Sequence, residues 1–219
     1  MIIKEELFEK LKLAKPFYLK NALDFKYGWE DLNNLLNLRP FWTTDRLRII
    51  APPSFQRKWP NRDWIKNINT WPPNIMNEVI SKYPCHVRDC TRISKNVNIF
   101  CSEVESRLKT SLDMHIFFSL TNKKEKGLGV HSDDHDVFVV QIEGESRVKL
   151  WNEKLDNKNL KEEPKNKPLY DIILKKNDVI LLAKEHIHYL TYTGKRMSFS
   201  FLIKRNNPNP QERDWINVL

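Results

Sequence analysis

The sequence predicts a mainly β protein, a small barrel or jelly roll flanked by helices. Two patterns predict it: apolar residues recur at helical spacings up to residue 110, and short apolar or alternating runs separated by turns follow. A length of 219 residues suffices for one substantial core, so we expect a single domain over residues 1–219. Within it we expect a helical buttress over 1–110, the β core over 111–205 and a short tail over 206–219.

The first half of the chain is expected to hold four helices. Apolar residues recur there every three or four positions, in residues 3–13, 29–37, 73–83 and 97–109. Pro72 and Pro73 stand where the third helix would start, a place that suits proline because the first turn needs no N–H donor. We expect these helices to cover one face of the barrel.

The second half of the chain predicts strands. Its apolar runs are rich in Val, Ile, Phe and Tyr, and the turn sequences "IEGES", "KKND" and "YTGK" suggest antiparallel connections between them. Eight strands are expected, over residues 113–120, 128–131, 136–142, 146–151, 169–174, 178–183, 187–192 and 197–204. Short strands in this number are typical of a small barrel or jelly roll.

The composition indicates a folded protein of a reducing compartment. Hydrophobic residues make up 40% and aromatic residues 11%, which excludes a disordered chain. No apolar run approaches the roughly 20 residues that span a bilayer, so no membrane association is expected. Three cysteines suggest no disulfide framework, and we expect a cytoplasmic protein. Cys85, His86, Cys90 and Cys101 could form a zinc site, but their spacing matches no common finger, and buried thiols are the simpler interpretation.

Basic residues are in excess, with 37 Lys and Arg against 28 acids and a net charge of +9. This charge can serve solubility or attract an acidic partner such as nucleic acid. Residues 42–66 interleave tryptophans with arginines and lysines, a pattern in which aromatic rings stack on bases while cations hold phosphates. Tryptophans also build cores and pocket walls. Both interpretations stay open, and RNA remains a candidate partner.

The segment "GVHSDDHDVFVVQIEG" (129–144) places polar residues before an apolar strand. His131 and Asp133 are two residues apart, so on a strand they point to the same face and can share one divalent metal. A third ligand must come from a neighbouring strand, and His186 and His188 are the candidates. Two histidines and one carboxylate cover one face of an octahedral metal, as in non-haem iron(II) oxygenases, and leave positions for a bidentate cosubstrate and oxygen.

These residues also carry a family resemblance. "GLGVHSDDHDVFVVQIEGESRVKLW" resembles the core of the JmjC and cupin-like 2-oxoglutarate oxygenases, above all the ribosomal-oxygenase type. "LKKNDVILLAKEHIHYL" resembles the distal strand of that family, and placing Asp178 on the Asp of its turn puts His188 at the third ligand position. The N-terminal "KPFYLKNAL" also resembles the start of these domains. The resemblance implies a double-stranded β-helix that binds iron(II) through His131, Asp133 and His188 and uses 2-oxoglutarate and O2.

The chain departs from the family where the family holds 2-oxoglutarate. The family places Lys or Arg after the glycine turn, and this chain has Ser146 there; Arg147 next to it points to the other face of a strand. "GKRMSFSF" offers Arg196 and Ser198, similar to the R-x-S pattern by which other 2-oxoglutarate oxygenases bind this carboxylate. A surface arginine is the alternative. His115 could reach cosubstrate or substrate if it points inward.

The resemblance implies a dioxygenase that hydroxylates a side chain of a protein or peptide. Two alternatives remain: an RNA-modifying oxygenase of the same fold, and a non-catalytic cupin-type binding protein, which Ser146 would allow. The ribosomal type continues past the barrel into a dimerisation region and a winged helix, whereas only residues 206–219 follow here. We therefore expect neither region, and a monomer or weak dimer.

Overall fold

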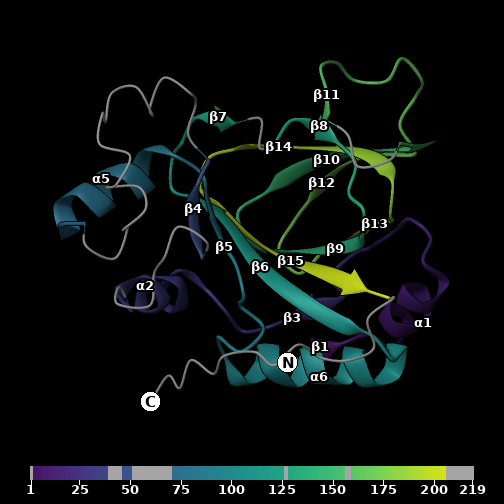
Figure 1. The fold of residues 1–219 in the computed structure, drawn as a ribbon, viewed down its shortest axis with the longest axis horizontal. Coiled ribbons are helices and arrows are strands. Elements are labelled where there is room, and N and C mark those ends of the chain that lie inside the picture. Colours follow the sequence, from purple (N-terminus) through teal and green to yellow (C-terminus); the bar gives the residue numbers. More distant parts are fainter. Residues whose placement is uncertain (1, 39–45, 51–70, 126–127, 156–158, 206–219) are drawn as a thin grey trace.

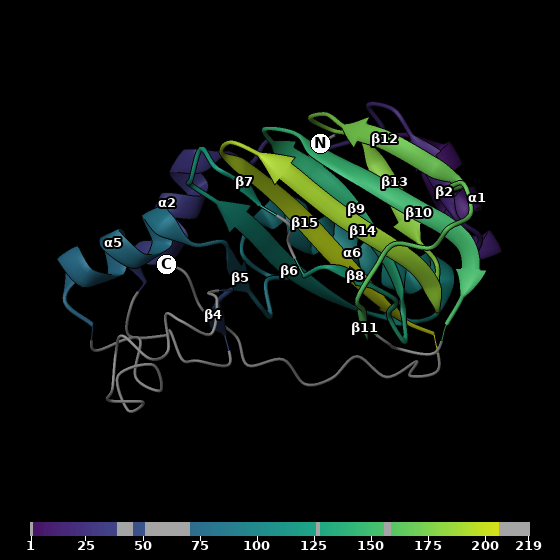
Figure 2. The ribbon, with the colours of Figure 1, turned by 90° about the horizontal axis from the view of Figure 1, so that it is seen from above.

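Two antiparallel sheets face each other in the computed structural model of the protein (Figure 1). The structure describes residues 2–38, 46–50, 71–125, 128–155 and 159–205. In this part of the chain, the larger sheet has seven strands in the order β2-β13-β9-β15-β6-β5-β4. The smaller sheet has six, in the order β11-β8-β14-β10-β12 with β7 paired to β14. Figure 2 shows the long strands of one sheet lying over those of the other.

The sheets draw their strands from both halves of the chain. The larger sheet consists of β2 (Phe17–Leu19), β4 (Leu47–Ile49), β5 (Cys85–Val87), β6 (Ser111–Ser119), β9 (Asp136–Glu143), β13 (Val179–Leu182) and β15 (Arg196–Lys204). The smaller sheet consists of β7 (Lys124–Glu125), β8 (Val130–His131), β10 (Ser146–Lys154), β11 (Asn159–Leu160), β12 (Tyr170–Leu174) and β14 (His186–Thr193). A separate pair is formed by β1 (Ile2–Ile3) and β3 (Leu23–Asp24).

The two faces of the larger sheet have different neighbours, as β15 illustrates. Phe199 and Phe201 belong to the core on the outer face, whereas Ser198 and Ser200 line the space between the sheets. Successive strand residues point to opposite faces, so one strand can supply both a core and a polar pocket wall. Part of the space between the sheets is closed by an apolar cluster in which Val139 of β9 and Val148 of β10 meet. The predicted double-stranded β-helix is confirmed.

Helices cover the outer face of the larger sheet, as predicted. They are α1 (Glu5–Leu13), α2 (Trp29–Asn37), α5 (Pro73–Lys82) and α6 (Lys95–Leu108). Figure 1 shows α6 crossing beneath β6, where Phe100 meets the rings of Phe138 and Phe201 at 5.9 and 5.4 Å between centroids. Ser94 caps the start of α6, because its hydroxyl accepts the Val97 N–H at 3.3 Å. No helix in the described ranges is long and apolar enough to cross a membrane.

The predicted elements are present with ends that differ by a few residues, and the first half of the chain contributes more than helices. Strands β2, β4 and β5 belong to the larger sheet and were not predicted, so residues 1–110 are not a purely helical buttress. Strands of three residues hold too few positions for alternation to emerge from the sequence. Most of the Trp- and Arg-rich stretch 42–66 and the whole tail 206–219 lie outside the described residues.

Candidate metal centre and pocket

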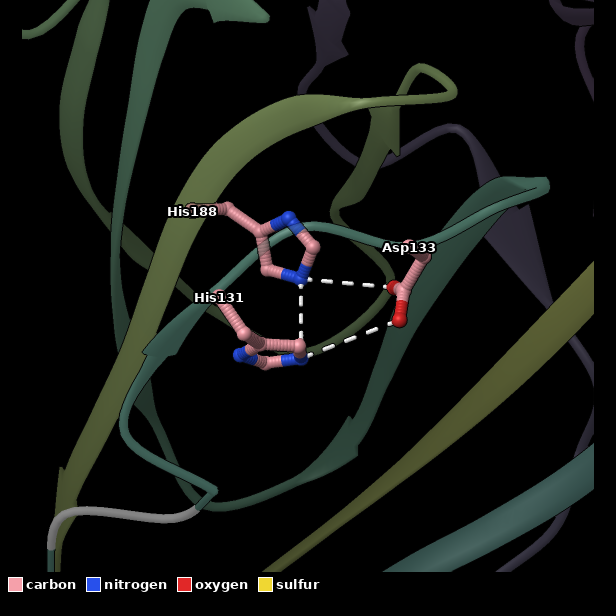
Figure 3. Close-up of side chains that lie close together, drawn as sticks. All are labelled: His131, Asp133 and His188. Carbon is pink, nitrogen blue, oxygen red and sulfur yellow. Dashed lines mark hydrogen bonds and ion pairs between the residues drawn. The ribbon is translucent and has the colours of Figure 1, made fainter. Parts of the chain in front are cut away.

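Three side chains converge between the sheets at one end of β8 and β14 (Figure 3). His188 of β14 lies directly across from His131 of β8 in the strand register. The Nε2 atom of His188 lies 3.2 Å from Nε2 of His131 and 3.4 Å from Oδ2 of Asp133, and His131 Nε2 lies 3.9 Å from Asp133 Oδ1. The backbone holds Asp133 in place because its carbonyl accepts the Glu185 N–H at 2.8 Å, just before β14.

The hydrogen bonds of the two histidines fix which ring nitrogen carries the proton. His131 Nδ1 lies 3.0 Å from the Gly129 carbonyl, and His188 Nδ1 lies 3.0 Å from the His186 carbonyl. A carbonyl only accepts, so both Nδ1 atoms donate, and each neutral ring keeps a lone pair on Nε2. Two lone pairs and a carboxylate therefore face one point.

This donor set fits a divalent cation. Metal–ligand bonds of about 2.1 Å at right angles place ligand atoms about 3 Å apart, close to the separations of 3.2 and 3.4 Å that His188 makes, while the separation of 3.9 Å between His131 and Asp133 is wider. Two imidazoles and one carboxylate also match the ligand preference of non-haem iron(II). The backbone carbonyls that receive the Nδ1 protons act as the outer partners that orient metal-binding histidines.

The pKa shifts of His131 and Asp133 favour the protonation states that bind a metal. Burial lowers the pKa of His131, and the neighbouring His188 lowers it further, so the ring stays neutral and able to bind a metal. Burial by itself raises the pKa of Asp133, but the proximity of His188, His131 and His135 outweighs burial, so the pKa is lowered. The carboxyl group is therefore ionised at neutral pH.

A pocket of about 240 Å³ extends from these ligands between the two sheets. Aliphatic side chains form much of its wall, among them Val139, Leu182 and Leu190. Arg196 and Ser198 of β15 line the same pocket. The pocket thus joins a candidate metal centre to a buried cation through an apolar passage.

Arg196 is a buried cation without an anionic partner in the described residues. It is 4% exposed, its Nη1 donates to Ser198 Oγ at 2.8 Å, and its guanidinium lies over the Tyr192 ring at 4.0 Å. Its Nε has no hydrogen-bond acceptor among those residues. Burial lowers the pKa of Arg196. An uncompensated buried charge is costly, and a bound carboxylate would compensate it.

The structure separates the other candidate residues of the sequence. His115 lines the pocket. Ser146 is 1% exposed but does not line the pocket, and its hydroxyl has no partner in the described part of the chain. Arg147 points outward, where its Nε and Nη2 donate to Asp171 at 2.7 and 2.8 Å. His186 is buried with Nδ1 3.1 Å from the Lys184 carbonyl, outside the metal cluster.

His86 lines the pocket and was not among the predicted pocket residues. Its ring stacks on Phe117 at 4.1 Å between centroids, and its Nε2 lies 2.9 Å from Nδ1 of His115. The sequence around His86 does not predict a position in the pocket wall, because β5 is only three residues long and follows a helical stretch. Cys85, Cys90 and Cys101 are buried thiols in no disulfide within the described part of the chain, as expected.

The chain matches a protein-family model and is similar in sequence to several curated proteins. The family model described as JmjC domain matches residues 95–211. A protein of Dictyostelium discoideum named bifunctional lysine-specific demethylase and histidyl-hydroxylase NO66 is 28% identical over 186 residues, which are 80% of this chain and 33% of that protein. A Drosophila grimshawi protein of the same name is 22% identical over 125 residues, 53% of this chain and 17% of that protein.

Solved structures of a ribosomal oxygenase, YcfD of Escherichia coli, are similar in fold. One is 17% identical with a TM-score of 0.61 and covers 97% of this chain and 54% of that chain. Another, described as a complex with cobalt and 2-oxoglutarate, is 17% identical with a TM-score of 0.56 and covers 91% and 49%. This chain spans about half the length of the oxygenase and a third or less of the curated relatives.

Proposed function

Since this chain belongs to the JmjC domain family, we propose that it is an oxygenase that uses iron(II), 2-oxoglutarate and O2 to hydroxylate a side chain of a protein or peptide. One observation carries the proposal. A single pocket holds three converging ligand atoms in one part of its wall and a buried arginine without a carboxylate partner in another. A cofactor and a dicarboxylate cosubstrate would use both features at once.

His131, Asp133 and His188 would hold the metal through the three atoms that already face one point. When bound, iron(II) supplies the activation of dioxygen and the oxidation of a C–H bond, which protein side chains cannot perform. The protein contributes position: the Nδ1–H donors of both histidines keep their rings in one orientation. Val139, Leu182 and Leu190 keep the surrounding wall apolar and limit the access of water.

Arg196 and Ser198 would hold the distal carboxylate of 2-oxoglutarate. A guanidinium binds a carboxylate through two parallel hydrogen bonds, and the hydroxyl beside it can donate a third. In the family, the cation that binds this carboxylate follows the glycine turn. In this chain, the proposed cation lies on the last strand instead. The outward side chain of Arg147, already paired with Asp171, supports that shift, as does the placement of Ser146 outside the pocket.

The substrate class is proposed from the relatives. The NO66 proteins are named for acting on lysine and histidine residues, and YcfD is named as a ribosomal oxygenase. A protein or peptide side chain is therefore the leading substrate for this chain, with hydroxylation as its reaction.

The test is the formation of succinate from 2-oxoglutarate by the aerobic, iron-loaded protein, with and without peptides. We expect slow turnover alone, faster turnover with a peptide substrate, and loss of both in Asp133→Ala. A circular dichroism spectrum shows whether that variant keeps its fold. If the wild type binds metal and 2-oxoglutarate but forms no succinate above the Asp133→Ala background, the non-catalytic binding protein is the correct interpretation.

A further inference from the structure

The edge of the larger sheet turns a basic face toward the pocket. Strands β4 and β5 bury Leu47, Cys85 and Val87 completely in the helix-covered core. Arg48 lies directly across from His86 in the register, at the alternate positions, so both side chains point away from that core. His86 lines the pocket, which puts this face on the pocket side.

A second arginine lies close to His86. The Arg88 N–H donates to the Arg46 carbonyl at 2.8 Å, so the pairing of the two segments extends beyond the strands. The charges of Arg48 and Arg88 both act on the His86 ring, so both guanidinium groups lie near it. We call Arg48, His86 and Arg88 the arginine face.

The arginines of this face form no ion pair with the described residues. Arg46, next to the face, does pair with Asp89 at 3.8 Å. Acids near the pocket also have partners: Asp113 lies 3.7 Å from the Lys204 ammonium and 3.2 Å from His115, and Asp134 pairs with His135. Within the part of the chain that the structure describes, Arg48 and Arg88 therefore carry positive charge that no carboxylate neutralises.

His86 lies between the arginines and the pocket, and its ring is neutral. The Asp113 carboxylate near His115 Nε2 favours a proton there, so His115 Nδ1 accepts the Nε2–H of His86 at 2.9 Å. Burial lowers the pKa of His86 to about 3, and His115, Arg48 and Arg88 contribute to the shift. The ring stays neutral, and its Nδ1 keeps a lone pair for a donor on the substrate.

We propose that the arginine face binds an acidic segment of the protein substrate, so that carboxylates near the reacting residue pair with Arg48 and Arg88. The inference rests on the proposed function, and it names the substrate class. Residues two apart on a strand lie about 6.6–6.8 Å apart, a spacing that side chains of an extended peptide repeat. Guanidinium groups bind carboxylates in bidentate geometry, whereas a basic segment would be repelled by Arg48 and Arg88, which no described carboxylate neutralises.

The described pocket wall suits a peptide. Proteins that bind single-stranded nucleic acid offer aromatic rings on which bases stack. In the described part of the chain, Phe117 lines the pocket, and its ring is already stacked on His86 with 7° between the ring planes. The arginine face supplies charge and hydrogen-bonding groups that the carboxylates and amides of an acidic peptide can use, and RNA is tested as the competing ligand.

The test is binding of fluorescein-labelled probes to the cobalt-loaded protein, followed by anisotropy at low salt. The probes are a glutamate-rich peptide, a lysine-rich peptide of equal length and an oligouridine RNA. We expect the glutamate-rich peptide to bind best and the double variant Arg48→Gln/Arg88→Gln to weaken that binding by about tenfold. The control Arg147→Gln removes an exposed arginine on the other sheet, paired with Asp171, and should leave binding unchanged.

Three results overturn the proposal. They are no binding of the glutamate-rich peptide, equal binding by wild type and double variant, or preferred binding of the lysine-rich peptide. Tighter binding of the RNA, lost in the double variant, assigns the face to nucleic acid instead. Titration of 2-oxoglutarate into the double variant separates this inference from the proposed function: it should be unchanged, and succinate formation fails independently if the protein is not an oxygenase.

Discussion

At the scale of single residues, the chemistry of the candidate site follows from which polar atoms donate hydrogen bonds and which keep lone pairs. His131 and His188 give their Nδ1 protons to backbone carbonyls and keep Nε2 free. Arg196 has five N–H donors in a buried place and no carboxylate among the described residues. Buried polar groups are usually satisfied, and a cation at the two Nε2 atoms and a carboxylate at Arg196 would satisfy these groups.

The first prediction separates the two neighbouring histidines of β14. His188→Ala should abolish the uptake of about one equivalent of cobalt(II) by the anaerobic protein, because it removes one of three converging ligands. His186→Ala should retain the metal, since the Nδ1 atom of that side chain bonds to Lys184 outside the cluster. Titration followed by cobalt absorption measures both. Metal loss in His186→Ala alone would mean that the ligand is misassigned.

The second prediction concerns the buried arginine. Arg196→Ala should weaken 2-oxoglutarate binding by about 2–4 kcal/mol, the cost of breaking a buried charged pair, while metal affinity stays nearly constant. The charge-transfer band of the iron(II) complex reports the titration under anaerobic conditions. Arg147→Ala is the matched control because its side chain is exposed and paired with Asp171. Weakened binding in the control, with Arg196→Ala unaffected, would return the cosubstrate to β10.

At the scale of elements, the position of Arg196 depends on the contact between two turns. Gly144 connects β9 to β10 with φ of +67°, and Gly194 connects β14 to β15 with φ of +89°. A Cβ added at Gly144 would lie 2.1 Å from the Lys195 carbonyl oxygen and 3.0 Å from Arg196 Cα. The first turn therefore packs tightly against the residues that begin β15, and only glycine allows this approach.

The third prediction tests that packing. Gly144→Ala should lower the free energy of unfolding by about 1–3 kcal/mol for backbone strain, with a further loss from the clash with the Lys195 carbonyl. Gly194→Ala should cost only the strain, because no atom lies within 4 Å of its added Cβ. Urea unfolding of both variants gives the comparison. Equal losses would show that the two turns do not constrain each other.

At the scale of the whole molecule, the larger sheet has the main core on one face and the pocket on the other. The helices cover its outer face, and the smaller sheet and the pocket lie on its inner face. This arrangement places several ionisable groups, including His86, in a partly buried wall whose stability depends on pH. The same wall carries the arginine face, so folding and the proposed recognition use common residues.

The fourth prediction is a pH dependence of stability in the metal-free protein. The pKa of His86 is about 3 in the folded state, below the ordinary value of 6.5. Between these values the unfolded chain binds more protons, so stability falls as pH drops from about 6.5 toward 3 and is fully present above 6.5. Melting temperatures between these pH values should fall less in His86→Phe, which keeps a ring to stack on Phe117. An identical pH profile in that variant would contradict the assignment.

The sequence by itself determined the strand pattern, the flanking helices, the metal-binding spacing of His131 and Asp133, and the R-x-S pair. These are local properties, because alternation and helical spacing decide which neighbouring side chains share a face. The family resemblance placed His188 at the third ligand position, and the tertiary structure puts this residue, and not His186, against His131. Only the tertiary structure decided that Ser146 lies outside the pocket. It also brought His86 to the pocket and placed Arg48 directly across from it in the strand register. Those outcomes depend on which distant strands pair and in what register, and short strands carry too little pattern to specify this in advance.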